Sequence, residues 1–156
     1  MDYVFTAGGN ELLHQIRPLW NELKKHHVAV AGVFSPVFAR ADWETRKRDL
    51  QQKAADGKLR VDLVTCGSEL IAYAVSTIDH KCIGEIDSLC VKEQYRGQGI
   101  GKQLIRRALD WMKSEGAKSY TLQVVHGNDR AMSLYQSLGF SPIMHIMMLP
   151  LQNRDS

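Results

Sequence analysis

The spacing of apolar residues changes along the chain and separates a helical N-terminal part from a part rich in strands. After a short strand over Tyr3–Ala7, apolar side chains return at every third or fourth position. This period predicts amphipathic helices, one that begins near Asn10 and kinks or restarts at Pro18, and one from about Asp42 to Ala55. The stretch Val28–Arg40 between them is apolar without a regular period.

From Leu59 onward the pattern is typical of strands, with two further helices among them. Apolar and alternating runs predict strands over residues 59–66, 69–79, 82–91, 118–125 and 142–149. Helices are expected from Ile100 to Gly116 and from Asn128 to Gly139, because both stretches carry an apolar stripe and end in glycine. The order of these elements predicts a mixed α/β domain with helices packed on one sheet.

Length and composition fit one ordinary globular domain over residues 1–156. Hydrophobic residues make up 44% of the chain and charged residues 24%, which is typical of proteins with an apolar core. Lys and Arg number 20 against 17 Asp and Glu, and this small excess predicts no nucleic-acid partner. No apolar run approaches the about 18 residues of a membrane span, and the N-terminus lacks the pattern of a signal peptide.

The cysteines and histidines predict neither a disulfide framework nor a metal site. Cys66, Cys82 and Cys90 form no CxxC pair, and their odd number favours reduced thiols. Reduced thiols favour a cytoplasmic location. The six histidines are scattered, and no spacing of His, Cys and Asp indicates a set of metal ligands.

The segment Glu93–Leu104, EQYRGQGIGKQL, places a glycine-rich turn between a predicted strand and a predicted helix, with glycines at positions 97, 99 and 101. A dinucleotide-binding fingerprint would need a glycine in place of Lys102, and a Walker loop would need Ser or Thr in place of Gln103. The backbone N–H groups of such a turn, the helix N-terminus and Arg96 nevertheless suit a phosphate or pyrophosphate. The alternative is a tight turn that needs one or two glycines.

Two stretches of the sequence resemble motifs of the GCN5-related N-acetyltransferases. The run RGQGIG, within LCVKEQYRGQGIGKQLI, resembles the family signature Arg/Gln-x-x-Gly-x-Gly/Ala, and NDRAMSLYQSLGF is similar to the second motif. Together they span Cys82–Phe140. The resemblance implies a mixed, mostly antiparallel sheet of six to seven strands flanked by about four helices. It also implies that the fourth and fifth strands, Cys82–Val91 and Lys118–Val125, splay apart, with a bulge near Asp87–Leu89.

The resemblance further implies acetyl-CoA as a cosubstrate and no metal. The backbone N–H groups of the glycine turn would hold the pyrophosphate, and the strand before the turn would pair with the pantetheine arm. The implied cofactor-binding residues are Leu89, Cys90, Val91, Arg96, Gly97, Gln98, Gly99, Ile100, Gly101, Lys102, Asn128 and Ala131. For Asn128 the alternative is a helix N-cap, and for Cys90 it is a buried structural thiol.

Acetyl transfer to an amine needs a base, an acid for the leaving thiolate and a donor to the oxyanion. Tyr135 matches the general acid of the family, although its apolar helix face also fits a core tyrosine. Glu85 and Asp87 are candidate bases, and the alternative is an acidic patch that binds a cationic acceptor. Strand alternation places both on one face with Leu89 and Val91, unless a bulge intervenes. The resemblance assigns the oxyanion to a backbone N–H near Val91.

For the acceptor, Phe34, Phe38 and Trp43 fall where family members build a substrate pocket, and core packing is the alternative. The sequence therefore predicts an N-acetyltransferase that moves an acetyl group to a primary amine of a small, cationic acceptor by direct attack in a ternary complex. The alternatives are a non-catalytic acetyl-CoA sensor and a peptide or protein N-acetyltransferase. The apolar segment 142–149 suits either a buried strand or the contact of a homodimer.

Overall fold

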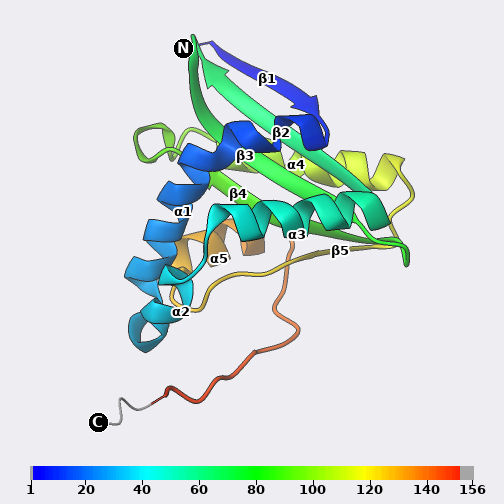
Figure 1. Ribbon diagram of the computed structural model, residues 1–156. Helices are drawn as coiled ribbons and strands as arrows, with labels where there is room; N and C mark the ends of the chain where they lie inside the picture. Colours follow the sequence, from blue (N-terminus) through cyan, green and yellow to red (C-terminus); the bar gives the residue numbers. More distant parts are fainter. Residues whose placement is uncertain (1, 152–156) are drawn as a thin grey trace.

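The computed structural model describes residues 2–151, in which one five-stranded sheet lies between two layers of helices (Figure 1). The strands are β1 (Tyr3–Gly8), β2 (Lys58–Cys66), β3 (Glu69–Ile78), β4 (Ile83–Val91) and β5 (Ser119–Leu122). They lie side by side in chain order, antiparallel except for β5, which runs parallel to β4. The predicted mixed, mostly antiparallel sheet is confirmed, with five strands in place of six to seven.

Helices cover both faces of this sheet. They are α1 (Arg17–Val30), α2 (Ser35–Ala39), α3 (Trp43–Asp56), α4 (Ile100–Ser114) and α5 (Asp129–Ser137), with 3-10 turns η1 (Asn10–Ile16), η2 (Gly32–Phe34) and η3 (Glu93–Tyr95). We call the side that α1 and α3 cover the α3 face, and the side that α4 and α5 cover the α4 face (Figure 1). No described helix is long and apolar enough to cross a membrane.

Two helix starts follow directly from the sequence. Pro18 lies in the first turn of α1, immediately after η1, where its missing N–H removes no helical hydrogen bond. Asp42 precedes α3, and its carboxylate accepts a hydrogen bond of 3.0 Å from the N–H of Thr45. The predicted restart at Pro18 and the helix that follows Asp42 are both confirmed.

A bulge in β4 changes which side chains share a face. Val75 of β3 pairs with Ser88, but the next residue, Ser76, pairs with Ile86, so Asp87 is the extra residue. The bulge therefore lies where it was predicted. Because of it, Asp87 and Ser88 both point to the α3 face, where the hydroxyl of Ser88 lies 2.7 Å from that of Tyr73.

The same bulge overturns the simple alternation along this strand. Leu89 and Val91 pack against the core of the α4 face, together with Ile100 and Leu104 of α4. Glu85 and Asp87 instead contact α3 on the opposite face. The four side chains therefore do not share one face, because the predicted bulge intervenes.

The strands β4 and β5 pair over a short length and then part. The last pair is Ile86 with Leu122, whereas β4 continues to Val91. The predicted splay is confirmed, and it leaves one edge of β4 without a strand partner from Asp87 to Val91. The strand expected over Lys118–Val125 is correspondingly shorter, since a ladder ends where its partner strand diverges.

The predicted last strand, Pro142–Leu149, is not formed. Residues 141–151 belong to no helix or strand, and they run away from the rest of the domain (Figure 1). Seven large apolar side chains of this segment are 57% to 92% exposed, namely Ile143, Met144, Ile146, Met147, Met148, Leu149 and Leu151. The apolar composition fits a strand, but a strand also needs an edge to pair with, and this segment pairs with none of the described strands.

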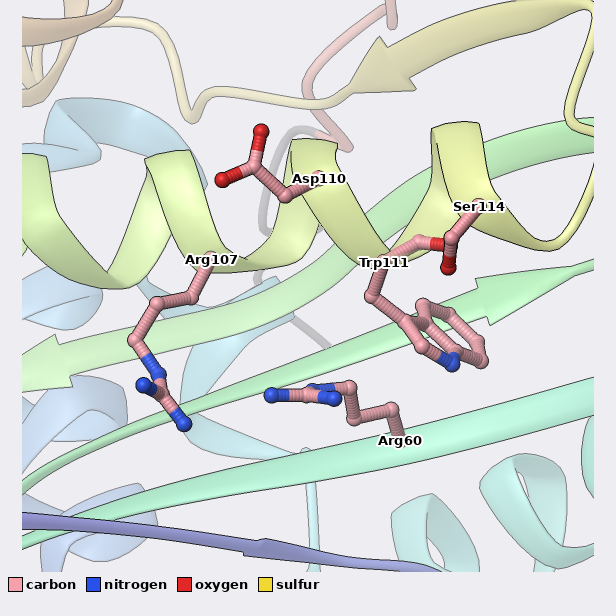
Figure 2. Close-up of a pocket in the computed structure, with 5 residues that line it drawn as sticks. All are labelled: Arg60, Arg107, Asp110, Trp111 and Ser114. Carbon is pink, nitrogen blue, oxygen red and sulfur yellow. The ribbon is translucent and has the colours of Figure 1, made fainter.

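A buried aspartate ties β2 to α4. The carboxylate of Asp62, which is fully buried, accepts hydrogen bonds of 2.9 and 3.0 Å from Arg60 and of 3.0 Å from Arg107. The two guanidinium groups face each other at the edge of a hollow of about 370 Å³, and the carboxylate of Asp110 points away from them (Figure 2). Arg107 also lies over the ring of Phe5, 5.4 Å from its centre.

We expect Asp62→Ala to lower the free energy of unfolding by about 3 kcal/mol, because two arginines lose their shared buried partner. Urea unfolding measures this change. Asp110→Ala is the matched control, since Asp110 lines the same hollow but forms no ion pair within residues 2–151, and we expect a change within about 0.5 kcal/mol. Equal unfolding midpoints for the two variants would show that the Asp62 network contributes no stability.

Candidate active site

The three alternating glycines between η3 and α4 have two different roles. Gly97 and Gly99 adopt left-handed conformations, with φ of +75° and +83°, and no described residue other than their chain neighbours comes within 4 Å of an added Cβ. Gly101 is helical, but an added Cβ would lie 3.3 Å from Leu134 of α5 and 3.8 Å from Val91. Two glycines therefore shape the turn, and the third lets α4 approach β4 and α5. This division explains why one or two glycines would not suffice.

The turn presents backbone donors at the start of α4. The first helical hydrogen bond there runs from the N–H of Gln103 to the oxygen of Gly99, at 3.1 Å. The N–H groups of Ile100, Gly101 and Lys102 precede it and have no acceptor within the helix. Together with the positive end of the helix dipole, they form a site suited to an anion.

Two side chains tie this turn to the sheet. Arg96 donates from Nε to the carbonyl of Val91 at 2.9 Å, so its guanidinium is held at the end of β4. The hydroxyl of Tyr3 on β1 donates to Oε1 of Gln98. The ring of Tyr3 also packs edge-on against Tyr95, with ring centres 6.3 Å apart. The turn is therefore braced from both sides, by β1 and by β4.

A cluster of charged side chains lies where β4 and β5 part, on the α3 face. Lys53 of α3 donates to Glu85 at 2.6 Å and also to Asp87. The second carboxylate oxygen of Asp87, whose side chain is fully buried, accepts a hydrogen bond of 2.6 Å from Thr77. The cluster borders a hollow of about 240 Å³, which we call the acceptor hollow because of the role that we propose for it below. It is lined by Arg46, Lys53, Glu85, Ile86, Asp87 and Gln123.

Burial and hydrogen bonds shift the pKa values of Asp87 and Glu85 in opposite directions. Burial, together with the hydrogen bond to Glu85, raises the pKa of Asp87 to about 7. The hydrogen bond from Asp87 lowers the pKa of Glu85 below its ordinary value. Burial opposes the charge of Lys53, but hydrogen bonds to Asp87 and Glu85 outweigh it and raise the pKa of the amine. Asp87 can therefore take up and release a proton near neutral pH.

Tyr135 lies on the other side of the same opening. It packs on the α4 face in the cluster that contains Ile86, and its ring meets Phe140 edge-on at 6.1 Å. Its hydroxyl makes no hydrogen bond with any residue from 2 to 151. Burial raises its pKa to about 12, so the phenol stays protonated at neutral pH. A protonated phenol and a carboxyl group with a pKa of about 7 thus flank the splay from opposite faces of the sheet.

The comparison with known proteins shows the family of the chain. The sequence profile of the acetyltransferase (GNAT) family matches residues 17–140. The chain belongs to this family. A match of that length covers most of the sheet, the glycine turn and both faces of the splay. The GNAT signature therefore coincides with the anion site at the start of α4 and with the unpaired edge of β4.

Individual relatives match over shorter stretches. An uncharacterized N-acetyltransferase, YobR, of Bacillus subtilis (strain 168) is 45% identical over 69 residues, 44% of this chain and 27% of the relative. N-alpha-acetyltransferase 30 of Schizosaccharomyces pombe is 37% identical over 73 residues, 47% of this chain and 49% of the relative. The chain thus spans about half or less of the length of these curated relatives.

Solved structures match almost the whole chain. A single-site mutant of protein BH1408 from Bacillus halodurans has a TM-score of 0.75 at 23% identity, over 96% of this chain and 99% of that one. The aminoglycoside N-acetyltransferase AAC(6')-Iy in complex with CoA has a TM-score of 0.69 at 17% identity, over 98% and 95%. At these identities the likeness shows the shared GNAT fold.

The remaining residues that the resemblance to the GNAT family implied differ in how deeply they are buried. Asn128 is 8% exposed at the start of α5, where its side chain does not cap the helix. Instead, its Oδ1 lies 3.2 Å from Nε2 of His26 on α1. Cys90 is buried in the core of the α3 face, opposite Leu89 and Val91 as expected, and burial raises its pKa to about 12. Ala131 lies in the first turn of α5 and is half-buried.

The three aromatic residues expected at an acceptor pocket differ in their surroundings. Trp43 is 4% exposed and packs against Trp20 in the core, with ring centres 5.5 Å apart. Phe34 and Phe38 are half-buried, and Phe38 meets His27 edge-on at 5.9 Å. None of the three lines the acceptor hollow. Core packing accounts for Trp43.

The sequence did not point to the cations of the acceptor hollow. Arg46 and Lys53 are seven residues apart on α3 and therefore lie on one face of that helix. That spacing was visible in the sequence, but nothing local showed that this face would meet Glu85 and Asp87. Within residues 2–151, no group of three or more His, Cys, Asp or Glu side chains is placed to hold a metal ion.

Proposed function

We propose that this chain is an acetyl-CoA-dependent N-acetyltransferase that acts by direct attack of a primary amine within a ternary complex. The observation that carries the proposal is the splay between β4 and β5. Asp87, with a pKa near neutrality, borders the splay on one face, and the protonated Tyr135 borders it on the other. The anion site at the start of α4 lies just beyond the end of β4.

Acetyl-CoA fits this site as a substrate. The N–H groups at the start of α4, with Gly97 and Gly99 open to solvent, suit its pyrophosphate. The outer edge of β4 at Leu89, Cys90 and Val91, which pairs with none of the described strands, offers the pantetheine amides the hydrogen bonds of a missing strand. Gln98, braced by Tyr3, would hold the turn in shape around the phosphates.

The proposed reaction uses both sides of the splay. The acceptor ammonium gives a proton to the partly exposed Glu85, which passes it to the buried Asp87, and the free amine attacks the thioester carbonyl. The C–N bond forms, the C–S bond breaks, and the phenol of Tyr135 gives its proton to the departing thiolate sulfur. The second proton that the attacking nitrogen loses as it becomes an amide returns to the tyrosinate through solvent. A backbone N–H near Val91 would donate to the oxyanion that forms between these steps.

The acceptor hollow supports a small acceptor. Its volume of about 240 Å³ is below the roughly 300–1,000 Å³ of pockets for drug-sized ligands. The sequence predicted a cationic acceptor from the acidic side chains of Glu85 and Asp87. In the structure, Arg46 and Lys53 offset their charges in the same hollow. The charge argument therefore supports an ammonium group on the acceptor and gives no preference for a polycation.

The alternatives are less well supported. A non-catalytic acetyl-CoA sensor would need no acid and base beside the splay, yet Asp87 and Tyr135 both lie there. A peptide or protein N-acetyltransferase would need an open groove in place of a small hollow. A homodimer through the exposed segment 142–149 stays a prediction.

Gly99→Ala is expected to weaken CoA binding about tenfold, because the left-handed φ of +83° strains alanine by about 1–2 kcal/mol and shifts the N–H groups after it. Titration calorimetry with CoA measures this change. Gly116→Ala is the matched control, with the same φ of +83° at the other end of α4. We expect it to leave the affinity unchanged, and equal losses in both variants would mean that the turn does not hold the phosphates.

The proposed activity is tested by amine-dependent release of the CoA thiol from acetyl-CoA. A panel of polyamines, amino acids, aminoglycosides and short peptides covers the acceptor classes. Release with at least one amine supports the proposal. Tight CoA binding without release for any amine would favour the sensor.

A further inference from the structure

Arg46 is a cation with spare hydrogen-bond donors in the acceptor hollow. It lies on α3, is half-buried, and donates from Nη2 to the backbone carbonyl of Asp87 at 2.7 Å. Its guanidinium forms no ion pair with any residue from 2 to 151. A guanidinium has five N–H donors in a rigid fork, so most of its donors are available to a ligand in the hollow. That fork matches the geometry of a carboxylate.

The charges in the hollow also favour an acceptor that carries an anionic group. Lys53 bridges Glu85 and Asp87, so its ammonium offsets one of the two carboxylate charges, and the guanidinium of Arg46 offsets the other. The four charges of the hollow therefore balance. An acceptor that brought only positive charge would meet Lys53 and Arg46 together. An acceptor that also carries an anionic group would find a partner for each of its charges.

Arg46 and the proposed base also lie side by side. Arg46 binds the carbonyl of Asp87, and both residues line the hollow together with Lys53 and the partly exposed carboxylate of Glu85. An anion held by Arg46 would therefore lie close to the group that deprotonates the amine. This proximity suits a molecule whose amine and carboxylate are joined by a single carbon.

We propose that the acceptor is an α-amino acid or a similarly small amine with an adjacent carboxylate, and that Arg46 determines this specificity by binding the carboxylate. The inference rests on the proposed acetyltransferase function and deepens it. The rival explanation is that Arg46 only braces the bulge of β4 through the carbonyl of Asp87. The two explanations differ in the substrates for which a change of Arg46 lowers kcat/KM.

Matched acceptors test the proposal. For several apolar side chains, the rate of acetylation is compared among the amino acid, its carboxamide and its decarboxylated amine, for example leucine, leucinamide and isopentylamine. The wild-type protein is expected to show a kcat/KM at least about tenfold higher for the amino acid than for either analogue. The carboxamide is the stricter comparison, because its amine is the more readily deprotonated.

Arg46→Gln separates specificity from bracing. We expect it to lower kcat/KM for the amino acid by about 10- to 100-fold, through the loss of charge-assisted hydrogen bonds. The values for the carboxamide and the amine should change by less than about threefold. Arg46→Lys, which keeps the charge but not the fork, should restore part of the loss. Arg48→Gln is the control, since Arg48 is exposed on the same helix and does not line the hollow.

Three outcomes overturn the inference, and they can be told apart. If the wild-type protein acetylates the analogues as well as the amino acids, the carboxylate is not recognised. If Arg46→Gln lowers kcat/KM for all three substrates alike, Arg46 only braces the bulge of β4. If no amine of any class is acetylated, the proposed function fails, and the inference fails with it.

Discussion

Asp87→Asn is expected to lower kcat by about 10² to 10⁴, the usual contribution of a general base. Asparagine has nearly the same shape but cannot accept the proton of the ammonium. Steady-state kinetics with saturating acetyl-CoA and acceptor measures the effect. Asp110→Asn is the control, because Asp110 is an exposed aspartate outside the acceptor hollow, and its kcat should not change. A loss below about threefold in Asp87→Asn would contradict a role as base.

The pH dependence of kcat tests the same role of Asp87. Burial raises the pKa of Asp87 to about 7, and only the deprotonated carboxylate can accept a proton. The kcat of the wild-type protein should therefore rise as pH increases through about 7. In Asp87→Asn this rise should be absent. A rise that persists in the variant would assign the titration to another group.

The stability of Asp87→Asn shows whether its loss of kcat could come from unfolding. The folded-state pKa of Asp87 is higher than the ordinary value of 3.8, so between these values the folded protein binds more protons than the unfolded chain. Its contribution to stability therefore falls as pH rises from about 4 to 7. Asparagine carries no charge and avoids this cost. Asp87→Asn should thus remain folded at neutral pH, as circular dichroism would show.

Tyr135→Phe is expected to lower kcat by about 10² to 10⁴, because the departing thiolate loses its proton donor. The hydroxyl makes no hydrogen bond within residues 2–151, so its removal should leave the unfolding midpoint and the CoA affinity unchanged. Tyr120→Phe, on the exposed side of β5, is the matched control. An unchanged kcat in Tyr135→Phe would reduce this residue to a packing role in the core.

Features that depend on neighbouring residues could be predicted from the sequence. The glycine turn followed from the glycine spacing together with the strand before it and the helix after it. The helix start at Asp42 followed from a capping side chain. The bulge at Asp87 and the splay came from the resemblance to a family whose motif covers both strands. For the glycine turn and the helix start, the determining residues lie within a few positions of the feature.

Features that depend on distant contacts could not be predicted. Lys53 and Arg46 reach Glu85 and Asp87 across more than thirty positions of the chain, and helical spacing alone does not say what a face will meet. Trp43 is aromatic and lies near the expected pocket in sequence, yet it packs in the core against Trp20. The segment 142–149 has the apolar character of a strand, but pairing depends on an available edge.

The central claim is that the chain transfers an acetyl group from acetyl-CoA to an amine held in the acceptor hollow. Mass spectrometry of both acceptor and protein after incubation with acetyl-CoA tests it most directly. We predict an acetyl group on the amine, in amounts equal to the thiol released, and none on Cys90 or Lys53. An unmodified acceptor despite bound CoA would contradict acetyl transfer. An acetylated protein that passes its acetyl group to acceptor added later would contradict direct attack.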